Sequence, residues 1–493
     1  MRHSTLSEHK FKKGVFITPF NSMDNIYELP DDYSWTYGRM PEYLWIALIL
    51  KRQGREKGLE ILQYIISEVH LLTPEIETLR LSDILRLDES IQARLYDYIV
   101  KAVSAETLAP LTIVLTHSNA PTFSRYFCCP ELTIEERRNI LVDAMNTVID
   151  QHSNEATDVR YIVIYFHLMI GKLKVQPQQL DIYKTYYLSK HDDEVMRVAR
   201  PSVRSTEMLL LNDKKPDTPF LENFWRVVSE MSDCELYATR FPEEKNNIGS
   251  YISSVYEALN YLKDVSVTTE PLKAKIKILL GIGTYSYKRF HELYSHNMFN
   301  SIAGRSCVRV MVEDYIMMKY LLIKESERPD IWSEYERYGL GQYKLVLSRS
   351  REKGIDNNAH FDDSYVELLV NEFLEEEYIN MDTKYFEKDN IRIKAKLVGE
   401  DELYGLYYDY DSAFEHGLWG AIRESSMIKC TNPAHLFHCV PDINDDIVMK
   451  SVLPDCIKVM NKTIKLLDKE IGIPEEIYNE VMRYELKPSG ETN

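Results

Sequence analysis

The chain has 493 residues and a formal net charge of −18, with 44% hydrophobic and 28% charged residues. This length predicts about two to four domains, and the composition excludes a disordered or fibrous protein. The longest unbroken apolar run covers residues 43–50, which is too short for a membrane-spanning helix of about 20 residues. The net negative charge excludes a broad basic surface for nucleic acid, but not a confined site with a few arginines.

The N-terminal residues and the cysteines indicate the cellular compartment. Residues 1–13 carry positive charges but lack the apolar stretch and the cleavage site of a secretory signal. The seven cysteines are sparse and odd in number, and Cys128 and Cys129 are adjacent. Such a set favours reduced thiols over a disulfide framework. We therefore expect a cytoplasmic protein that makes no contact with a membrane.

Helical periodicity dominates the chain and predicts an all-α fold. The first long helix should cover residues 42–69 and bend near Gly54, and the next should cover residues 90–103. Thr133 and Glu136 have the spacing of a capping box, which predicts a helix that starts there and ends near Gln151. Further helices are predicted over residues 159–173, 220–231, 248–262 and 271–294.

Two polar segments, residues 212–219 and 242–249, predict a domain boundary. Residues 391–396 alternate between apolar and polar side chains, so a small β excursion is predicted near 385–405, as a hairpin or an extended segment. The predicted organisation is an N-terminal helical domain (1–215), a linker region (216–249), a helical domain with a candidate polar site (250–440) and C-terminal helices (441–493).

The most informative stretch begins at Gly304, where Arg305, Arg309 and Glu313 recur at steps of four residues. This spacing places the three side chains on one stripe of a helix whose other positions are mostly apolar. One interpretation is a solvated face with an Arg309–Glu313 ion pair, worth roughly a few tenths of a kcal/mol. The alternative is a cleft between helices, in which a paired arginine holds a phosphate or a carboxylate.

A second candidate element covers residues 407–420, where Ser412 and His416 lie one helical turn apart. Both side chains can therefore face one cavity, and a histidine there can titrate near neutral pH. Several tyrosines, Tyr410 among them, precede His416 and favour a binding surface. The alternative is that His416 is a hydrogen-bonded packing residue of its helix.

These two elements resemble a widespread bacterial helical family of unknown function. The resemblance rests on Arg309-Val-Met-Val-Glu313 with its apolar helix, on residues 332–338 and on the late Ser412 and His416, and it covers residues 250–440 approximately. It implies a helical fold and a polar cluster of Arg309, Glu313 and His416. It implies no reaction, because the activity of that family is not established. Val310 departs from the family's usual serine, which weakens a role for that hydroxyl.

A second resemblance is to HEPN ribonucleases, whose usual mark is an arginine followed by a histidine after four to six residues. Arg160 and His167 have this spacing, as do Arg289 and His296, and each pair shares a helix face. The residue after the arginine departs from the family, which usually has a polar residue there. The alternative for both pairs is a packed helix with a hydrogen-bonded histidine.

A third cluster contains residue types that bind zinc, namely Cys430, His435, His438 and Cys439. Structural zinc normally uses two separated ligand pairs, and this short run would have to wrap tightly around the ion. We therefore interpret the segment as a packing loop and assign neither a metal ligand nor a cofactor. The tract that starts at Gly281 has two glycines within a helical pattern, which predicts helix packing. No phosphate-binding loop or dinucleotide fingerprint occurs in the sequence.

Metal-independent RNA cleavage needs a base and a cation near the scissile phosphate. We hypothesise a bacterial effector or accessory protein of an antiviral or toxin system, acting as such a ribonuclease or as a nucleic-acid-handling protein. Alternatives are a non-catalytic helical scaffold and a small-molecule sensor. Expected partners are a protein, RNA or a nucleoprotein complex, and a second copy of the chain. The candidate catalytic residues are Arg309, Glu313 and His416, and the candidate binding residues are Arg305, Tyr410, Ser412, Arg160 and His167.

Overall fold

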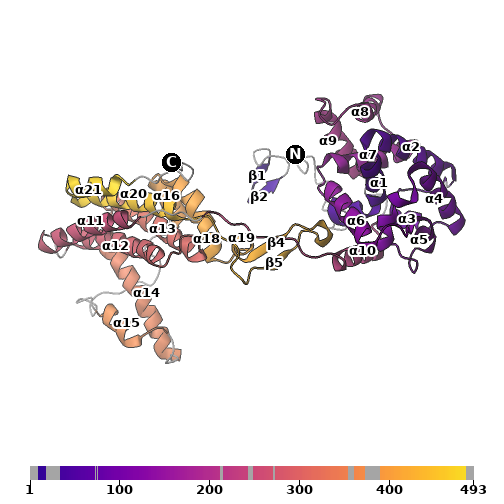
Figure 1. Ribbon diagram of the computed structural model, residues 1–493. Coiled ribbons are helices and arrows are strands. Elements are labelled where there is room, and N and C mark those ends of the chain that lie inside the picture. Colours follow the sequence, from indigo (N-terminus) through magenta and orange to yellow (C-terminus); the bar gives the residue numbers. More distant parts are fainter. Residues whose placement is uncertain are drawn as a thin grey trace. The chain divides into compact units, whose positions relative to one another are not determined.

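The computed structural model describes residues 9–17, 34–72, 74, 76–210, 215–242, 248–269, 273–353, 360–371 and 389–484. Helices account for most of these residues, which confirms the all-α prediction. The chain forms two compact units (Figure 1). The N-terminal unit comprises Met1–Tyr237 and Lys429–Cys439, and the C-terminal unit comprises Ala238–Ile428 and Val440–Asn493. The chain therefore passes between the two units three times.

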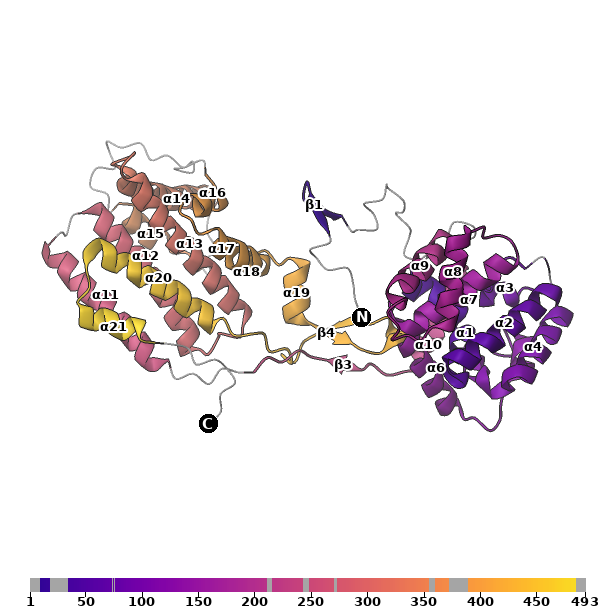
Figure 2. The same cartoon turned by 90° about the horizontal axis from the view of Figure 1, so that it is seen from above.

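The N-terminal unit is built around helix α1, which packs against α2, α6 and α7 (Figure 2). Every residue of α1 from Met40 to Leu50 is buried, so the apolar run in the sequence is a core helix that has neighbours on all sides. The helices of this unit are α1 (Met40–Gln53), α2 (Arg55–Leu72), α3 (Leu81–Ile84), α4 (Glu89–Val103), α5 (Pro121–Phe127), α6 (Ile134–Val148), α7 (Asn154–Met169), α8 (Pro177–Leu188), α9 (Met196–Leu209) and α10 (Thr218–Glu230).

Local signals in the sequence explain several helix boundaries. Gly54 has a φ of 77°, a left-handed conformation that suits glycine, and it separates α1 from α2 as predicted. The predicted capping box opens α6, where the Thr133 hydroxyl accepts a hydrogen bond from the Glu136 N–H at 3.1 Å. In return, the Glu136 carboxylate accepts one from the Thr133 N–H at 2.8 Å. The predicted linker 216–249 contains α10, whose Trp225 is buried in the core of the N-terminal unit.

The C-terminal unit is centred on helix α13, which packs against α12, α16, α18 and α20. Helix α12 also packs against α11 and α20, and α14 packs against α15. The helices of this unit are α11 (Gly249–Thr269), α12 (Ala274–Ser295), α13 (Ile302–Lys324), α14 (Ile331–Lys353), α15 (Asp363–Val370), α16 (Ile391–Leu397), α17 (Asp401–Leu403), α18 (Asp409–Glu415), α19 (Trp419–Ser426), α20 (Leu453–Ile471) and α21 (Glu475–Met482).

The predicted β excursion near residues 385–405 is wrong for the described residues, because residues 391–397 form helix α16. Asn390 caps this helix and accepts a hydrogen bond from the Ile393 N–H at 3.0 Å. Lys394 is fully buried and lies over the Tyr320 ring at 5.2 Å. The cap and this buried contact favour a helix over the alternating pattern. Residues 385–388 lie outside the described residues.

The strands are short and lie elsewhere. β1 (Lys10–Lys12) and β2 (Val15–Ile17) form an antiparallel hairpin in which Phe11 is paired with Phe16. A second sheet has the order β3 (Leu236–Tyr237), β4 (Met427–Cys430) and β5 (Cys439–Pro441). Within it β3 and β4 are antiparallel, and Leu236 is paired with Cys430. This pairing brings the end of the first N-terminal segment beside the segment that returns to the same unit.

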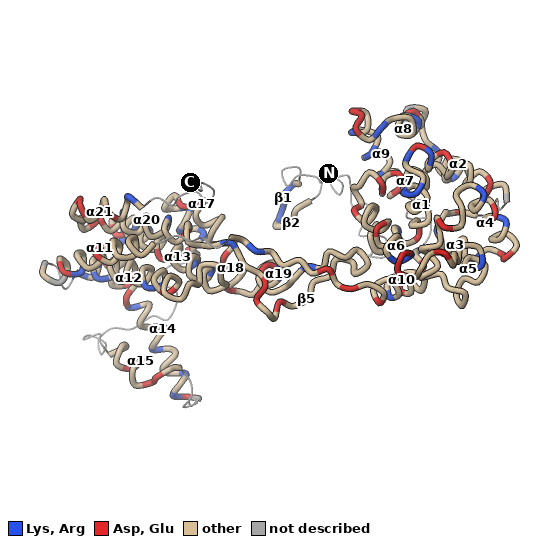
Figure 3. Tube along the Cα trace, viewed as in Figure 1, with Lys and Arg blue, Asp and Glu red and all other residues tan. Residues whose placement is uncertain are grey.

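Two further observations bear on earlier expectations. In the described part of the chain, no helix combines the length and the apolar character required to cross a membrane. Basic and acidic residues are interspersed along the helices of each unit (Figure 3).

Candidate functional site

A groove of about 520 Å³ runs along helices α11 and α12 in the C-terminal unit. Its floor is apolar and its rim is cationic. The floor consists of Leu259, Ile276 and Leu280, and the rim carries Lys263, Lys277 and Lys288. The three lysines are exposed, and Tyr285, which also lines the groove, is 49% exposed. We call this feature the lysine-rimmed groove.

Helical spacing places the lining residues of α12 on one face, since positions 277, 281, 284 and 288 recur at steps of three and four. A Cβ atom at Gly281 would meet no atom within 4 Å, so this glycine faces open space in the groove. At Gly283, two positions on, a Cβ atom would lie 3.0 Å from Cδ1 of Leu467 in α20. The predicted helix packing of this tract is therefore observed at Gly283, whereas Gly281 lines the groove.

The rim lysines are only partly neutralised by neighbouring carboxylates. Lys277 lies 2.5 Å from a carboxylate oxygen of Glu336, and Lys263 lies 3.2 Å from Asp264. Among the described residues Lys288 has no ion-pair partner, and none of the residues that line the groove is acidic. The groove is thus a local cationic site within a chain of net negative charge.

The predicted stripe on α13 forms an arginine–tyrosine cluster with the π-helical turn Tyr404–Tyr408. The Arg309 guanidinium donates a hydrogen bond to the Tyr408 hydroxyl at 2.8 Å and lies 4.7 Å from the centre of its ring. It also lies 3.6 Å from the carboxylate of Glu313. Arg309 and Glu313 are both partly exposed. The predicted ion pair therefore exists, and it lies beside an aromatic ring on the edge of the helix.

Arg305, the first residue of the stripe, is buried and ties loops to the helix. Its guanidinium donates hydrogen bonds to the carbonyl oxygens of Lys450 at 2.5 Å and Phe299 at 3.4 Å. Asp411 of α18 is also buried, and burial raises its pKa to about 7 although the charge of Arg305 lowers it. Arg305 thus joins its helix to two other backbone positions through these hydrogen bonds.

The other predicted residues of the late element lie around α18. Tyr410 donates a hydrogen bond to Glu424 at 2.6 Å, and Ser412 is half-buried. His416 is exposed at the end of the helix, where its backbone N–H donates a hydrogen bond to the Ser412 carbonyl at 3.1 Å. Among the described residues, no hydrogen bond or ion pair joins His416 to Arg309 or Glu313. The structure therefore brings together two members of the predicted catalytic trio, and the catalytic role of the three residues stays a prediction.

Arg160 of α7 is buried in the N-terminal unit with Arg39 and Glu207. Glu207 of α9 forms an ion pair with Arg39 and lies 3.5 Å from Nε of Arg160. The Arg160 guanidinium also lies 4.3 Å from the centre of the Trp35 ring. Burial lowers the pKa of Arg160 to about 9. This arrangement is a buried ion-pair network with an aromatic neighbour, and the binding role of Arg160 stays a prediction.

His167, the second residue of the HEPN-like spacing, is also buried. Its Nδ1 lies 2.8 Å from the carbonyl oxygen of Val163, one turn earlier in α7. Because a carbonyl oxygen only accepts, this ring nitrogen donates the hydrogen bond. The contact matches the alternative stated for this pair, a packed helix with a hydrogen-bonded histidine.

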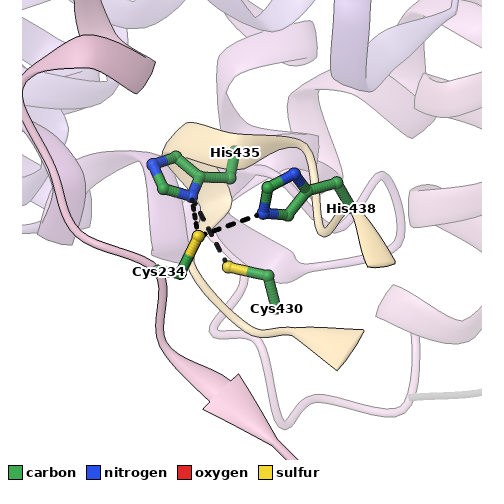
Figure 4. A group of neighbouring side chains, drawn as sticks. All are labelled: Cys234, Cys430, His435 and His438. Carbon is green, nitrogen blue, oxygen red and sulfur yellow. Dashed lines mark hydrogen bonds between the residues drawn. The ribbon is translucent and has the colours of Figure 1, made fainter. Parts of the chain in front are cut away.

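A group of four potential metal ligands, the Cys/His group, lies in the N-terminal unit. It consists of Cys234, Cys430, His435 and His438, whose ligand atoms all lie within 4.8 Å of one another (Figure 4). Cys234 follows α10, and the other three belong to the returning segment 429–439. Desolvation, together with the neighbouring Cys430 thiol, raises the pKa of Cys234. A bound metal cation would lower the pKa of this thiol, because metals bind the thiolate.

The sequence analysis grouped three of these four residues, interpreted their segment as a packing loop, and missed Cys234. It placed Cys439 in the cluster, whereas the structure brings Cys234 to that position. Cys234 stands far from the other three along the chain, so only the pairing of β3 with β4 reveals its neighbours. A spacing rule that is applied within one short segment cannot find such a ligand. The lysine-rimmed groove was missed for a related reason, because its lysines come from two helices.

Comparison with known protein families supports the resemblance to a family of unknown function over part of its range. Residues 283–435 match the model of a family of unknown function, DUF5677. No curated protein and no solved structure matches the chain. The matched range includes Arg305, Arg309 and His416 as well as Cys430 and His435. The similarity to HEPN ribonucleases has no such support and stays a prediction.

Proposed function

We propose that this protein is a non-catalytic helical scaffold that binds an acidic, amphipathic segment of a partner protein in the lysine-rimmed groove. One observation carries the proposal: a groove of about 520 Å³ combines an apolar floor with three exposed lysines and no acidic lining residue. An effector role in an antiviral or toxin system rests on the sequence resemblances alone.

The chemistry of the groove favours an amphipathic peptide. Leu259 and Ile276 are each 8% exposed and form a floor between two helices. Amphipathic helices bind such floors through apolar side chains at steps of three and four residues. Carboxylates on the flanks of the bound segment would then meet Lys263 on one helix and Lys277 or Lys288 on the other. Apolar contact provides affinity in this arrangement, and the rim charges provide orientation and speed of association.

A protein segment suits this groove better than a nucleic acid does. A site for single-stranded nucleic acid combines a basic track with aromatic rings on which the bases stack. Here Tyr285 is the aromatic residue among those that line the groove, and the floor is aliphatic.

The test uses the full-length protein and fluorescence anisotropy. The probe is a labelled helical peptide with leucines at steps of three and four residues and glutamates between them. A second peptide with lysines in place of the glutamates, and a labelled single-stranded oligonucleotide, complete the set. We expect the acidic peptide to bind, and the affinity to fall as salt is added because the rim is exposed to solvent.

The matched variants locate the binding. Lys263→Glu combined with Lys288→Glu should weaken binding of the acidic peptide about 10-fold, since two rim charges are reversed. Lys465→Glu changes an exposed lysine of α20 outside the groove and should leave the affinity unchanged. Equal binding by all three proteins would place the contact elsewhere. Binding of the oligonucleotide in preference to the peptide would overturn the protein-binding proposal.

A further inference from the structure

We propose that Cys234, Cys430, His435 and His438 bind one zinc ion, which fastens the returning segment 429–439 to the end of helix α10. The four residues come from two stretches of chain that are far apart in sequence but belong to the same unit. This site is independent of the lysine-rimmed groove, which lies in the other unit.

Three of the distances between the ligand atoms lie close to the edge lengths of a zinc tetrahedron. With Zn–S bonds of about 2.3 Å and Zn–N bonds of about 2.0–2.1 Å, neighbouring ligand atoms lie about 3.3–3.8 Å apart. The Sγ atom of Cys234 lies 3.3 Å from Nδ1 of His435 and 3.2 Å from Nε2 of His438. The Sγ atom of Cys430 lies 3.6 Å from Nδ1 of His435. These four atoms surround a common centre, towards which all four side chains point in Figure 4.

The ligand types favour zinc and a structural role. Two thiols and two imidazoles in a compact group are a ligand set that zinc prefers, whereas calcium and magnesium prefer oxygen. Four protein ligands complete the tetrahedral coordination and leave no position for water or substrate. The site is therefore built to hold chain segments together rather than to activate a reactant.

The hydrogen-bond partners of His435 favour the neutral ring with its proton on Nε2, which leaves Nδ1 able to bind a metal. Its Nε2 lies 3.0 Å from the carbonyl oxygen of Ser232 and 3.2 Å from that of Ser229, at the end of α10. Carbonyl oxygens only accept hydrogen bonds, so Nε2 carries the proton of the neutral ring. The unprotonated Nδ1 then faces both thiols. A metal-bound histidine typically donates its second ring N–H to a carbonyl or a carboxylate in this way.

The backbone of the returning segment also positions the ligands. Leu436 and Phe437 both have a φ of 53°, a left-handed conformation that non-glycine residues rarely adopt. This tight turn lies between His435 and His438 and directs both rings to one side. The Cys430 N–H donates a hydrogen bond to the His438 carbonyl at 2.8 Å, which closes the loop. Two successive strained residues are consistent with a loop whose conformation is set by a ligand.

Metal analysis of the purified full-length protein is the direct test. We expect one zinc ion per chain, retained through gel filtration and released when the thiols are alkylated under denaturing conditions. After replacement of zinc by cobalt(II), the visible spectrum should show the intense bands of a tetrahedral site, with thiolate-to-cobalt charge transfer in the near ultraviolet. A protein purified in the presence of added zinc that contains none would overturn the proposal.

Matched variants separate the four ligands from their neighbours. Cys234→Ser should lower the zinc content at least 5-fold, whereas Cys439→Ser should leave it unchanged, because Cys439 follows His438 directly but is outside the group. His438→Cys replaces one zinc ligand by another and should retain the metal with stronger charge-transfer absorption. That variant keeps the test decisive if Cys234→Ser fails to fold. Equal zinc loss in the Cys234 and Cys439 variants, or an unchanged cobalt spectrum in His438→Cys, would contradict the assignment.

Discussion

The Cys/His group in the N-terminal unit and the arginine–tyrosine cluster in the C-terminal unit differ in what their polar atoms face. In the Cys/His group two thiols and two ring nitrogens face one another around a common centre. In the arginine–tyrosine cluster Arg309 already has Tyr408 and Glu313 as partners. The first arrangement has ligand atoms that face one another and can receive an added ion, whereas in the second the guanidinium already contacts a hydroxyl and a carboxylate of the protein. If the Cys/His group binds zinc, convergence of ligand atoms is a better guide to a site than the spacing of charged residues along a helix.

The largest expected effect follows from removal of one ligand of the Cys/His group. Cys430→Ser should destabilise the N-terminal unit by about 4 kcal/mol, because loss of a structural metal is among the most destabilising single changes. For a unit of this size we expect its unfolding temperature to fall by about 8–16 °C. Differential scanning calorimetry measures this shift, and hydrogen exchange of residues 429–439 should accelerate in the same variant. An unfolding temperature of Cys430→Ser equal to that of the wild type would show that the Cys/His group holds no structural metal and does not differ from the arginine–tyrosine cluster in this respect.

The next effect concerns Asp411, which is buried near Arg305 in the C-terminal unit. Burial, with smaller contributions from Asp455 and Glu424, raises the pKa of Asp411 to about 7, while Arg305 opposes the shift. An aspartate has a pKa of about 3.9 in the unfolded chain. Between these two values the folded state binds more protons than the unfolded state, so stability falls as the pH rises from about 4 to 7.

Asp411→Asn removes this titration. As the pH rises from 5 to 8, the free energy of unfolding of the variant should increase by about 2–3 kcal/mol relative to that of the wild type. Most of this increase should occur below pH 7. Urea unfolding at several pH values measures the difference. Asp409→Asn, at an exposed position two residues earlier, makes the same substitution outside the core and serves as the control. A stability difference that does not depend on pH would show that Asp411 is not protonated in the folded protein.

The smallest expected effect concerns the predicted catalytic residues. Arg309→Ala should cost about 1 kcal/mol, because it removes one hydrogen bond and one partly exposed ion pair. His416→Ala should change stability by less than about 0.5 kcal/mol, since His416 is exposed. If the ribonuclease hypothesis is correct, both variants lose RNA cleavage despite their intact fold. Unchanged cleavage and unchanged cellular toxicity in His416→Ala would end that hypothesis and leave the cluster with a structural role.

Much of the fold could be predicted from the sequence because its signals are local. Gly54 ends α1, and Thr133 with Glu136 starts α6, through contacts that span one helical turn. The alternation at residues 391–396 was misleading because burial of Lys394 against Tyr320 depends on a distant part of the chain. Periodicity reports which positions differ in polarity, but the packing partner decides which structure they adopt.

The candidate sites were harder to predict because each depends on chain segments that meet only after folding. Cys430, His435 and His438 are residue types that bind zinc, but their spacing within one short segment led to the interpretation as a packing loop. Cys234, which completes the group, comes from the other side of the β3–β4 pair. Conversely, Arg160 and His167 had the spacing of a functional pair, and the structure places both in the core. There Arg160 lies near the Glu207 carboxylate, and His167 donates a hydrogen bond to the Val163 carbonyl. Spacing within one helix does not distinguish a buried partner from a bound ligand.

The discontinuous N-terminal unit has a consequence for protein synthesis. Residues 429–439 belong to a unit that otherwise ends at Tyr237, so the ribosome completes the intervening segment before this unit can close. At a translation rate of about 5–20 residues per second, Cys430 is synthesised about 10–40 s after Cys234. During that interval β3 lacks its partner β4, and α10 lacks its contacts with the returning segment. An expression fragment that stops at residue 237 would remain permanently in this incomplete state.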